Sequence, residues 1–210
     1  MRISLILPLG TDISLVSEFT YLGSVISRDL SDEIDVNRRI QKAGNAFGMM
    51  RKSLFSSPVV KLKTKANVYR TFILAILLYG VECWSLTEKL LNRLRSFHRR
   101  CIRSICHVTL RNRLRTTDLL ERLSLESIDT CICRQQLRWA GHVIRMPWSR
   151  LPRKMLSCWV RSKRPRGAPK YTYGRSLMKC LKKANIDTER WHIIAKDRKS
   201  WRSRIHSLKI

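Results

Sequence analysis

Apolar residues recur at intervals of three and four along much of this chain, and this spacing restricts the fold more than any other feature. Between Val36 and Leu54 the apolar positions are separated alternately by four and three residues. That spacing places them on one face of an amphipathic α-helix. Residues 62–79 and 88–106 carry similar patterns, and the second half of residues 62–79 is apolar on every side. We therefore expect a mostly α-helical protein with residues 62–79 at the centre of a helical bundle.

A short region near the N-terminus has the composition of β-structure. Residues 18–27 contain several β-forming residues, and Gly23 lies in the middle of the run, where a bend or a close backbone approach is expected. Asp32 follows a turn and is expected to cap the first helix. The sequence thus predicts a short β-hairpin in front of the helices.

The C-terminal half contains further helical patterns around one segment rich in proline. Asp118 and Glu121 have the spacing of a capping box ahead of a short helix, and Ser127 can cap a helix that runs to about residue 145. A linker is predicted next, followed by helices at about 172–184 and 188–208, with Thr188 as the cap of the last. These patterns divide the chain into a hairpin region, a helical bundle, a basic linker and a C-terminal helical segment, which are residues 1–28, 29–145, 146–170 and 171–210.

Positive charge far exceeds negative charge in this sequence. There are 43 Lys and Arg against 15 Asp and Glu, which gives a net charge of +28. The excess is small before residue 60 and densest after residue 145. A solvated surface requires no such gradient, whereas a polyanionic partner would relieve the self-repulsion. The composition therefore indicates a protein that binds nucleic acid and disfavours an enzyme that acts on small-molecule substrates.

No part of the sequence predicts secretion or a membrane span. The longest apolar run, Phe72–Val81, is far shorter than the ~20 residues that a transmembrane helix requires. Residues 1–10 are apolar but short, and they lack the small-residue cleavage site of a signal peptide. The seven cysteines are odd in number and follow no disulfide framework, which suits a reducing compartment. We expect the protein in the nucleus or the cytoplasm.

The sequence contains no recognisable catalytic constellation. It lacks a Gly-rich phosphate loop and a carboxylate pair that could hold Mg²⁺, and the cluster at residues 32–35 is better explained as the acidic first turn of a helix. Zinc is an alternative, because two groups of His and Cys occur: His98, Cys101, Cys106 and His107, then Cys131, Cys133 and His142. Zinc fingers draw their ligands from two converging elements, whereas the first three residues share one predicted helix. We therefore expect no bound metal.

Basic residues form one side of the helix predicted over residues 128–145. They recur at helical spacing and are Arg134, Arg138, His142 and Arg145. Another side carries apolar residues, namely Ile132, Trp139 and Val143. Because no glutamate is interleaved with the arginines, we predict that the basic side lies along a phosphate backbone, to which arginine can donate two hydrogen bonds at once.

A second basic element follows in the predicted linker. Residues 161–170 are too rich in proline for a helix and predict a flexible basic arm, which also fits a nuclear import signal. Its basic residues are Arg161, Lys163, Arg164, Arg166 and Lys170.

Several segments resemble, in the same order, the reverse transcriptases of non-LTR (LINE-type) retrotransposons. Phe19–Ser27 is similar to the primer-grip motif of that family, and Leu78–Trp84 is similar to a motif of its thumb region. Leu137–Met146, with the sequence LRWAGHVIRM, is the most specific match. Other matching segments are Phe97–Ile105, Arg150–Pro152, Arg164–Gly167 and Trp191–Arg202. The resemblance extends over about residues 18–205.

The resemblance implies a helical, thumb-like bundle behind a primer-grip hairpin, with residues 1–28 as the remnant of a palm domain. The family's catalytic aspartates lie in the palm, in a segment that would precede this chain. The chain alone would then hold a primer–template duplex without polymerising, and Mg²⁺ would bind only with the missing palm. The expected partners are RNA, DNA or an RNA–DNA hybrid, and a polypeptide that supplies the palm and fingers. The candidate contacts with nucleic acid are Tyr21, Leu22, Gly23, Arg99, Arg103, Arg134, Arg138, His142, Arg145, Arg161, Lys163, Arg164, Arg166 and Lys170.

Three alternatives remain open from the sequence. The chain could act as a separate piece that complements a palm domain supplied by another polypeptide. It could be a domesticated scaffold that binds nucleic acid or chromatin. It could also be a decayed element without function.

Overall fold

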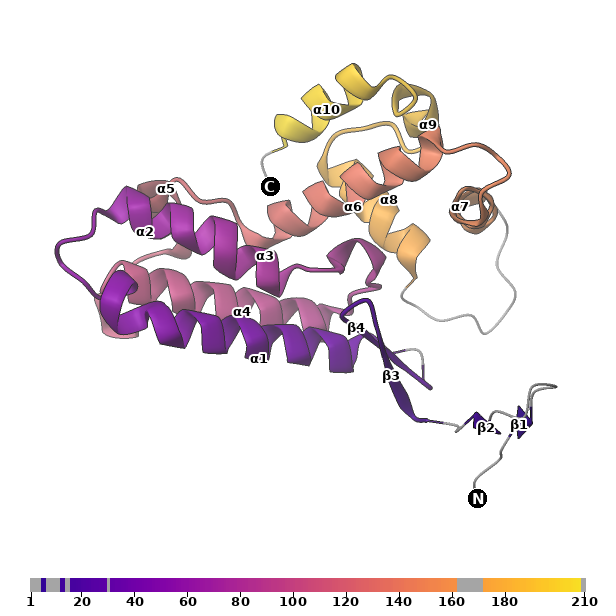
Figure 1. Ribbon diagram of the computed structural model, residues 1–210. Coiled ribbons are helices and arrows are strands. Elements are labelled where there is room, and N and C mark those ends of the chain that lie inside the picture. Colours follow the sequence, from indigo (N-terminus) through magenta and orange to yellow (C-terminus); the bar gives the residue numbers. More distant parts are fainter. Residues whose placement is uncertain (1–4, 7–11, 14–15, 30, 162–171, 209–210) are drawn as a thin grey trace.

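The computed structural model describes residues 5–6, 12–13, 16–29, 31–161 and 172–208. The chain is mostly helical, with a short antiparallel hairpin near the N-terminus, as the sequence predicted (Figure 1). Within these residues, no helix combines the length and the apolar character needed to cross a bilayer.

The hairpin consists of β3 (Glu18–Tyr21) and β4 (Ser24–Ser27), and a smaller pair, β1 (Leu5–Ile6) and β2 (Asp12–Ile13), precedes it. Residues 18–27 thus form both strands of the predicted hairpin. Leu22 and Gly23 form the turn between them, with φ angles of 46° and 86°. A two-residue turn with both residues in the left-handed region matches the twist of the strands, and glycine adopts this conformation without strain.

Helices α1 to α5 and the hairpin form the first part of the molecule, which we call the N-terminal bundle (residues 16–132). Helix α1 is followed by a π-helical turn, Arg51–Phe55, and a second π-helical turn, Tyr69–Ile73, separates α2 from α3. A 3-10 turn, Val81–Cys83, follows Gly80, which has a φ of 78° and ends the helical run. The helices are α1 (Glu33–Met50), α2 (Leu62–Val68), α3 (Leu74–Leu77), α4 (Glu88–Ile105) and α5 (Thr116–Leu123).

Three details of this bundle differ from the sequence prediction. Phe72 and Tyr79 are exposed, so residues 62–79 are covered on one side only. The carboxylate of Asp32 does not cap α1, because it accepts a hydrogen bond from the backbone N of Ser85 at 2.7 Å. Asp118 and Glu121 both lie within α5 rather than ahead of it.

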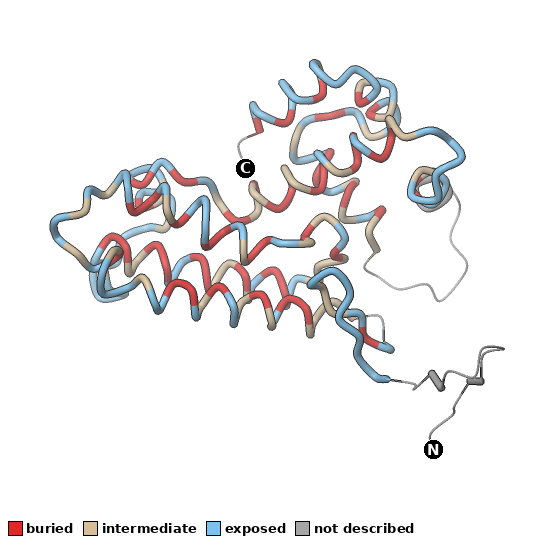
Figure 2. Tube along the Cα trace, viewed as in Figure 1, coloured by how far each residue is buried: buried red, intermediate tan, exposed pale blue. Residues whose placement is uncertain are grey.

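Helix α6 (Ile128–Arg145) connects the two parts of the core, and Ser127 caps it as expected by accepting a hydrogen bond from the backbone N of Thr130. Ile128 and Ile132 belong to the hydrophobic cluster of the N-terminal bundle, whereas the apolar residues from Cys133 onward belong to a second cluster. We call the second part the C-terminal bundle (residues 133–208). Figure 2 shows buried positions recurring along α1, α4 and α6, while β3 is exposed throughout.

The C-terminal bundle corrects two predictions. The linker expected over residues 146–170 contains a helix, α7 (Leu151–Arg161), and residues 162–170 of that segment lie outside the described residues. The single helix expected over residues 188–208 is broken, because Asp197 caps a new helix through the backbone N atoms of Lys199 and Ser200, and Thr188 caps none. The remaining helices are α8 (Tyr173–Lys183), α9 (Trp191–Ile194) and α10 (Arg198–His206).

Candidate nucleic-acid interface

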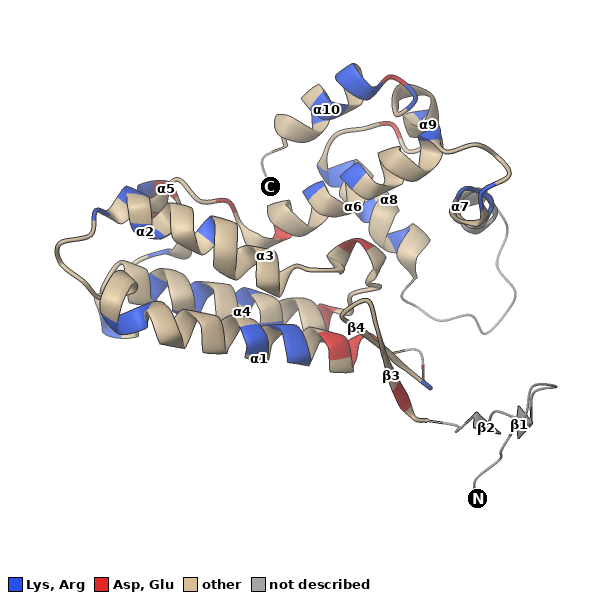
Figure 3. Ribbon diagram, in the orientation of Figure 1, with Lys and Arg blue, Asp and Glu red and all other residues tan. Residues whose placement is uncertain are grey.

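A groove of about 720 Å³ lies between α6 and α10. Its lining includes four arginines and two histidines and no acidic residue: Arg138, His142, Arg145, Arg198, Trp201, Arg202, Ile205 and His206. Figure 3 shows Lys and Arg positions along both helices. The groove therefore presents one sign of charge from two helices that lie far apart in the sequence.

The groove exists because α10 packs directly against α6 at Gly141. Trp201 is 2% exposed, and its Nε1 donates a hydrogen bond to the backbone O of Leu137 at 3.0 Å. A Cβ atom on residue 141 would overlap the indole ring of Trp201. Glycine at this position thus permits the contact that places the arginines of α10 opposite those of α6.

The positive charge in the groove is largely unneutralised. Within the described part of the chain, Arg138, Arg198 and Arg202 form no ion pair, and all three are exposed. The pKa of Arg145 is lowered, first by burial and then by repulsion from the neighbouring charge of Arg198. Crowded, unpaired guanidinium groups of this kind favour the binding of an anion such as phosphate.

Some residues of the basic side predicted on α6 face the groove, and others bind to the protein itself. Arg138 and His142 are exposed to the groove, whereas Arg145 donates a hydrogen bond to the backbone O of Ala195 at 2.7 Å. The side chain of Arg134 is only 15% exposed, forms an ion pair with Glu126, and donates to backbone oxygens at the end of the chain, those of Ile205 and Leu208. Arg134 therefore links α6 to α10 and to the segment after it, and it is not among the residues that line the groove.

Arg99 and Arg103 lie on α4, away from the groove. Arg99 is exposed and contacts Ser96, while Arg103 donates to the backbone O of Thr109 at 3.1 Å and to that of Leu114 at 2.8 Å. The guanidinium group of Arg103 is thus occupied by the protein itself. The prediction that it contacts phosphate has no support in this geometry.

The hairpin turn is fastened to the N-terminal bundle through its backbone. Tyr79 donates from Oη to the backbone O of Leu22 at 2.8 Å, and Arg39 donates from Nη2 to the backbone O of Gly23 at 2.5 Å. Arg39 also stacks on the ring of Tyr79, 4.2 Å from its centroid. The side chains of Tyr21 and Leu22 stay exposed, the latter by 75%. The side chains of Tyr21 and Leu22 are therefore available for contact with a partner. The positive φ of Gly23 is by itself a sufficient reason for a glycine at that position.

The remaining candidates fall in or beside the undescribed part of the chain. Arg161 is the last residue of α7. Lys163, Arg164, Arg166 and Lys170 lie outside the described residues.

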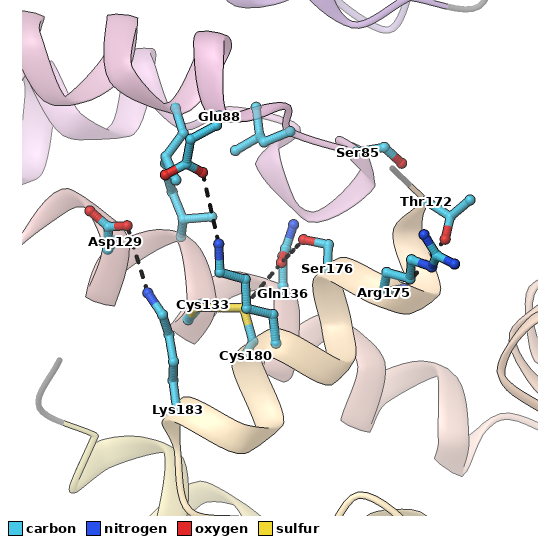
Figure 4. A pocket seen from close by; sticks show the side chains of 14 residues that line it. Ser85, Glu88, Asp129, Cys133, Gln136, Thr172, Arg175, Ser176, Cys180 and Lys183 are labelled. Atoms are coloured by element: carbon cyan, nitrogen blue, oxygen red, sulfur yellow. Dashed lines mark hydrogen bonds and ion pairs between the residues drawn. A yellow bond between two sulfur atoms is a disulfide. The ribbon is translucent and has the colours of Figure 1, made fainter. Parts of the chain in front are cut away.

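A second cavity, of about 260 Å³, lies where α4, α6 and α8 meet (Figure 4). Charges of both signs line it, and four of them form ion pairs. Lys183 lies 3.8 Å from Asp129, and Arg95 also binds Asp129, which lowers the pKa of that carboxyl. Lys179 lies 3.8 Å from Glu88. These ion pairs link α8 to α4 and α6, and the lining of the cavity mixes acidic with basic residues, unlike that of the groove.

Uncharged groups complete this joint. Gln136 is fully buried and donates to the backbone O of Trp84 at 3.2 Å, while Ser176 donates to its Oε1 at 3.1 Å. Cys133 and Cys180 form a disulfide between α6 and α8, which the cysteine spacing did not indicate.

Among the His and Cys residues weighed as zinc ligands, His98 is hydrogen-bonded and Cys133 forms the disulfide with Cys180. His98 is buried, with Nδ1 2.8 Å from Oη of Tyr69 and Nε2 3.3 Å from the backbone O of Glu126. Burial lowers the pKa of His98 to about 4. In the described ranges, no three or more His, Cys, Asp or Glu side chains are grouped so that they could hold a metal ion.

Comparison with known proteins gives one informative match. The chain is similar to an uncharacterized transposon-derived protein of Caenorhabditis elegans, with 28% identity over 202 residues that cover 91% of this chain and 71% of the relative. No protein-family profile and no solved structure matches the chain. The similarity supports a transposable-element origin.

Five groove residues were not among the contacts predicted from sequence: Trp201 and Ile205, which pack against α6, and Arg198, Arg202 and His206. Arg198, Arg202 and His206 recur every four residues, which places them on one face of α10. That spacing lies within the helix predicted over residues 188–208, so it could have identified a second basic face.

Proposed function

We propose that this chain is a nucleic-acid-binding part of a LINE-type reverse transcriptase, and that it holds RNA, DNA or a hybrid duplex by its sugar–phosphate backbone. The observation that carries the proposal is the α6–α10 groove, where four arginines and two histidines meet without an acidic residue. The transposon-derived relative and the resemblance of Leu137–Met146 to that family support the same origin.

The chemistry proposed for the groove is electrostatic. Arg138 and Arg202 are exposed and can each donate two hydrogen bonds to a phosphate, and a bound backbone would reduce the repulsion between Arg145 and Arg198. Contacts to phosphate position a duplex without reading its sequence. The chain alone is therefore proposed to bind without polymerising, and catalysis with Mg²⁺ would require a palm domain on another polypeptide.

Removal of the groove charges tests this proposal. We expect the triple variant R138Q/R198Q/R202Q to bind a fluorescent primer–template duplex at least about tenfold more weakly than the wild type in an anisotropy titration at 100 mM salt. The matched control is K42Q/R51Q/K52Q, which removes three exposed charges from the N-terminal bundle. Equal losses in the two triple variants would show that only the net charge matters and would contradict a specific groove.

The substrate preference separates a reverse-transcriptase part from a general scaffold. The exposed side chains of Tyr21 and Leu22 at the hairpin turn could contact a primer end. We expect tighter binding to a recessed primer–template junction than to a blunt duplex, and no primer extension by the pure chain with Mg²⁺. Equal affinity for the two duplexes would favour a domesticated scaffold protein.

A further inference from the structure

The last five residues of the connection between α4 and α5 carry an arginine at every second position. Arg111, Arg113 and Arg115 are all exposed, and Leu110 beside them is 79% exposed. Within the described residues none of the three guanidinium groups forms an ion pair, although Asp118 follows on α5. This connection is therefore a compact patch of unneutralised charge.

The shape of the connection is fixed by hydrogen bonds. Arg103 joins its two ends, because it donates to the backbone O of both Thr109 and Leu114. Asn112 accepts from the backbone N and the hydroxyl of Thr109, each at 2.8 Å. Arg113 has a φ of 51°, in the left-handed region. A loop ordered in advance loses less conformational entropy when it binds a partner.

The surroundings of the loop add positive charge. His107, at its start, lies with Nε2 3.4 Å from Nζ of Lys65, which is buried. Arg103, which holds the loop, brings a further guanidinium group to it. The loop thus lies in a locally basic region, where an anionic partner would be attracted.

The position of the loop separates it from the groove. The connection between α4 and α5 lies at the end of the N-terminal bundle that points away from α10 (Figure 1). A duplex segment seated between α6 and α10 would therefore leave Arg111, Arg113 and Arg115 free. All three cations are arginines, which suit paired contacts to phosphate better than lysines do.

We propose that this loop is a second binding site for a nucleic-acid backbone, and that one chain bridges two segments of nucleic acid. The bridging rests on the proposed binding in the α6–α10 groove, whereas the loop site stands on its own geometry. Arg103 is a positioning residue in this arrangement: it holds the loop and leaves the phosphate contacts to its three neighbours.

A capture assay tests the bridging. One short duplex is immobilised on beads, the chain is added, and a second, fluorescent duplex is then offered. We expect the wild type to retain the second duplex, and R111Q/R113Q/R115Q to retain about tenfold less, while still binding the immobilised duplex. The control K42Q/R51Q/K52Q should retain it as the wild type does. Undiminished capture by the loop variant, or an equal loss in the control, would overturn the proposal.

The two proposals fail in different ways. If R138Q/R198Q/R202Q binds a single duplex as tightly as the wild type, the proposed function of the groove is wrong. If that variant weakens single-duplex binding but the loop variant still captures the second duplex, only the loop proposal is wrong. Bridging by two associated chains through their grooves would give this second result.

Two variants of Arg103 test its positioning role. Lysine keeps the charge but cannot donate to two carbonyls in the fixed geometry of a guanidinium group. We expect R103K and R103Q to reduce capture to a similar extent, with faster amide exchange in residues 109–114 in both. Full capture by R103K together with loss in R103Q would show that Arg103 contacts phosphate directly.

Discussion

A Cβ atom on residue 141 would overlap Trp201, so Gly141→Ala should separate α10 from α6. We expect the free energy of unfolding to fall by about 1–3 kcal/mol, as for other overpacked cores, and the affinity for nucleic acid to fall with it. Urea unfolding and anisotropy would measure the two effects. Gly48 is a matched control, because nothing lies within 4 Å of a Cβ built there. Gly48→Ala should leave stability equal or higher, and similar losses in both variants would contradict the packing argument.

His98 gives the protein a pH-dependent stability. Its pKa is about 4 in the fold because it is buried, against an ordinary value of 6.5. The unfolded chain binds a proton at His98 more tightly than the folded chain does. The part of the folding stability that depends on a neutral His98 is therefore complete above pH 6.5 and is lost as the pH falls toward 4. We expect a loss of about 3 kcal/mol at pH 4, measured by urea unfolding. His98→Gln should remove this part of the pH dependence, so an unchanged difference between pH 7 and pH 4 would contradict the assignment.

Among elements, the hairpin turn is held to the N-terminal bundle by two side chains, and one of them acts through a hydroxyl group. Tyr79→Phe removes the hydrogen bond to the backbone O of Leu22 but keeps the ring on which Arg39 stacks. We expect a loss of stability of about 0.5–1 kcal/mol and faster amide exchange in residues 22–24. Tyr21→Phe changes an exposed tyrosine of the same hairpin and should leave the exchange as it is. Equally fast exchange in both variants would contradict a role for the Tyr79 hydroxyl in holding the turn.

The helices that could be predicted most closely are those with a buried seam and a strong cap. The limits of α4 and α6 follow from apolar spacing and from Thr87 or Ser127, which accept hydrogen bonds from the first turn. The break before α10 could not be found from spacing, because Trp201 and Ile205 continue an apolar pattern across it. At this break the carboxylate of Asp197 accepts hydrogen bonds from two backbone N–H groups and so begins a new helix. Helix α7 was missed because Pro152 suggested a linker, although proline is tolerated in the first turn.

The candidate site was predictable in part. Helical spacing placed the basic residues of α6 on one side, but it could not tell which of them the chain itself would use. Arg134 and Arg145 donate to backbone oxygens more than 45 residues further along the chain, at Ile205, Leu208 and Ala195. Such acceptors are set by tertiary packing, which no local pattern records. The choice between a structural and a binding arginine therefore required the fold.

At the scale of the whole molecule, the groove and the loop predict a steep dependence of binding on salt. Each phosphate contact releases condensed cations, so with ~6–10 contacts the affinity should fall about 10³–10⁵-fold between 50 and 200 mM salt. Anisotropy titrations with one duplex over this range would give the slope of log affinity against log salt. The slope for R138Q/R198Q/R202Q should be shallower by the amount expected for the loss of about three phosphate contacts. A shallow slope in the wild type would mean that its charge of +28 serves a purpose other than binding a phosphate backbone.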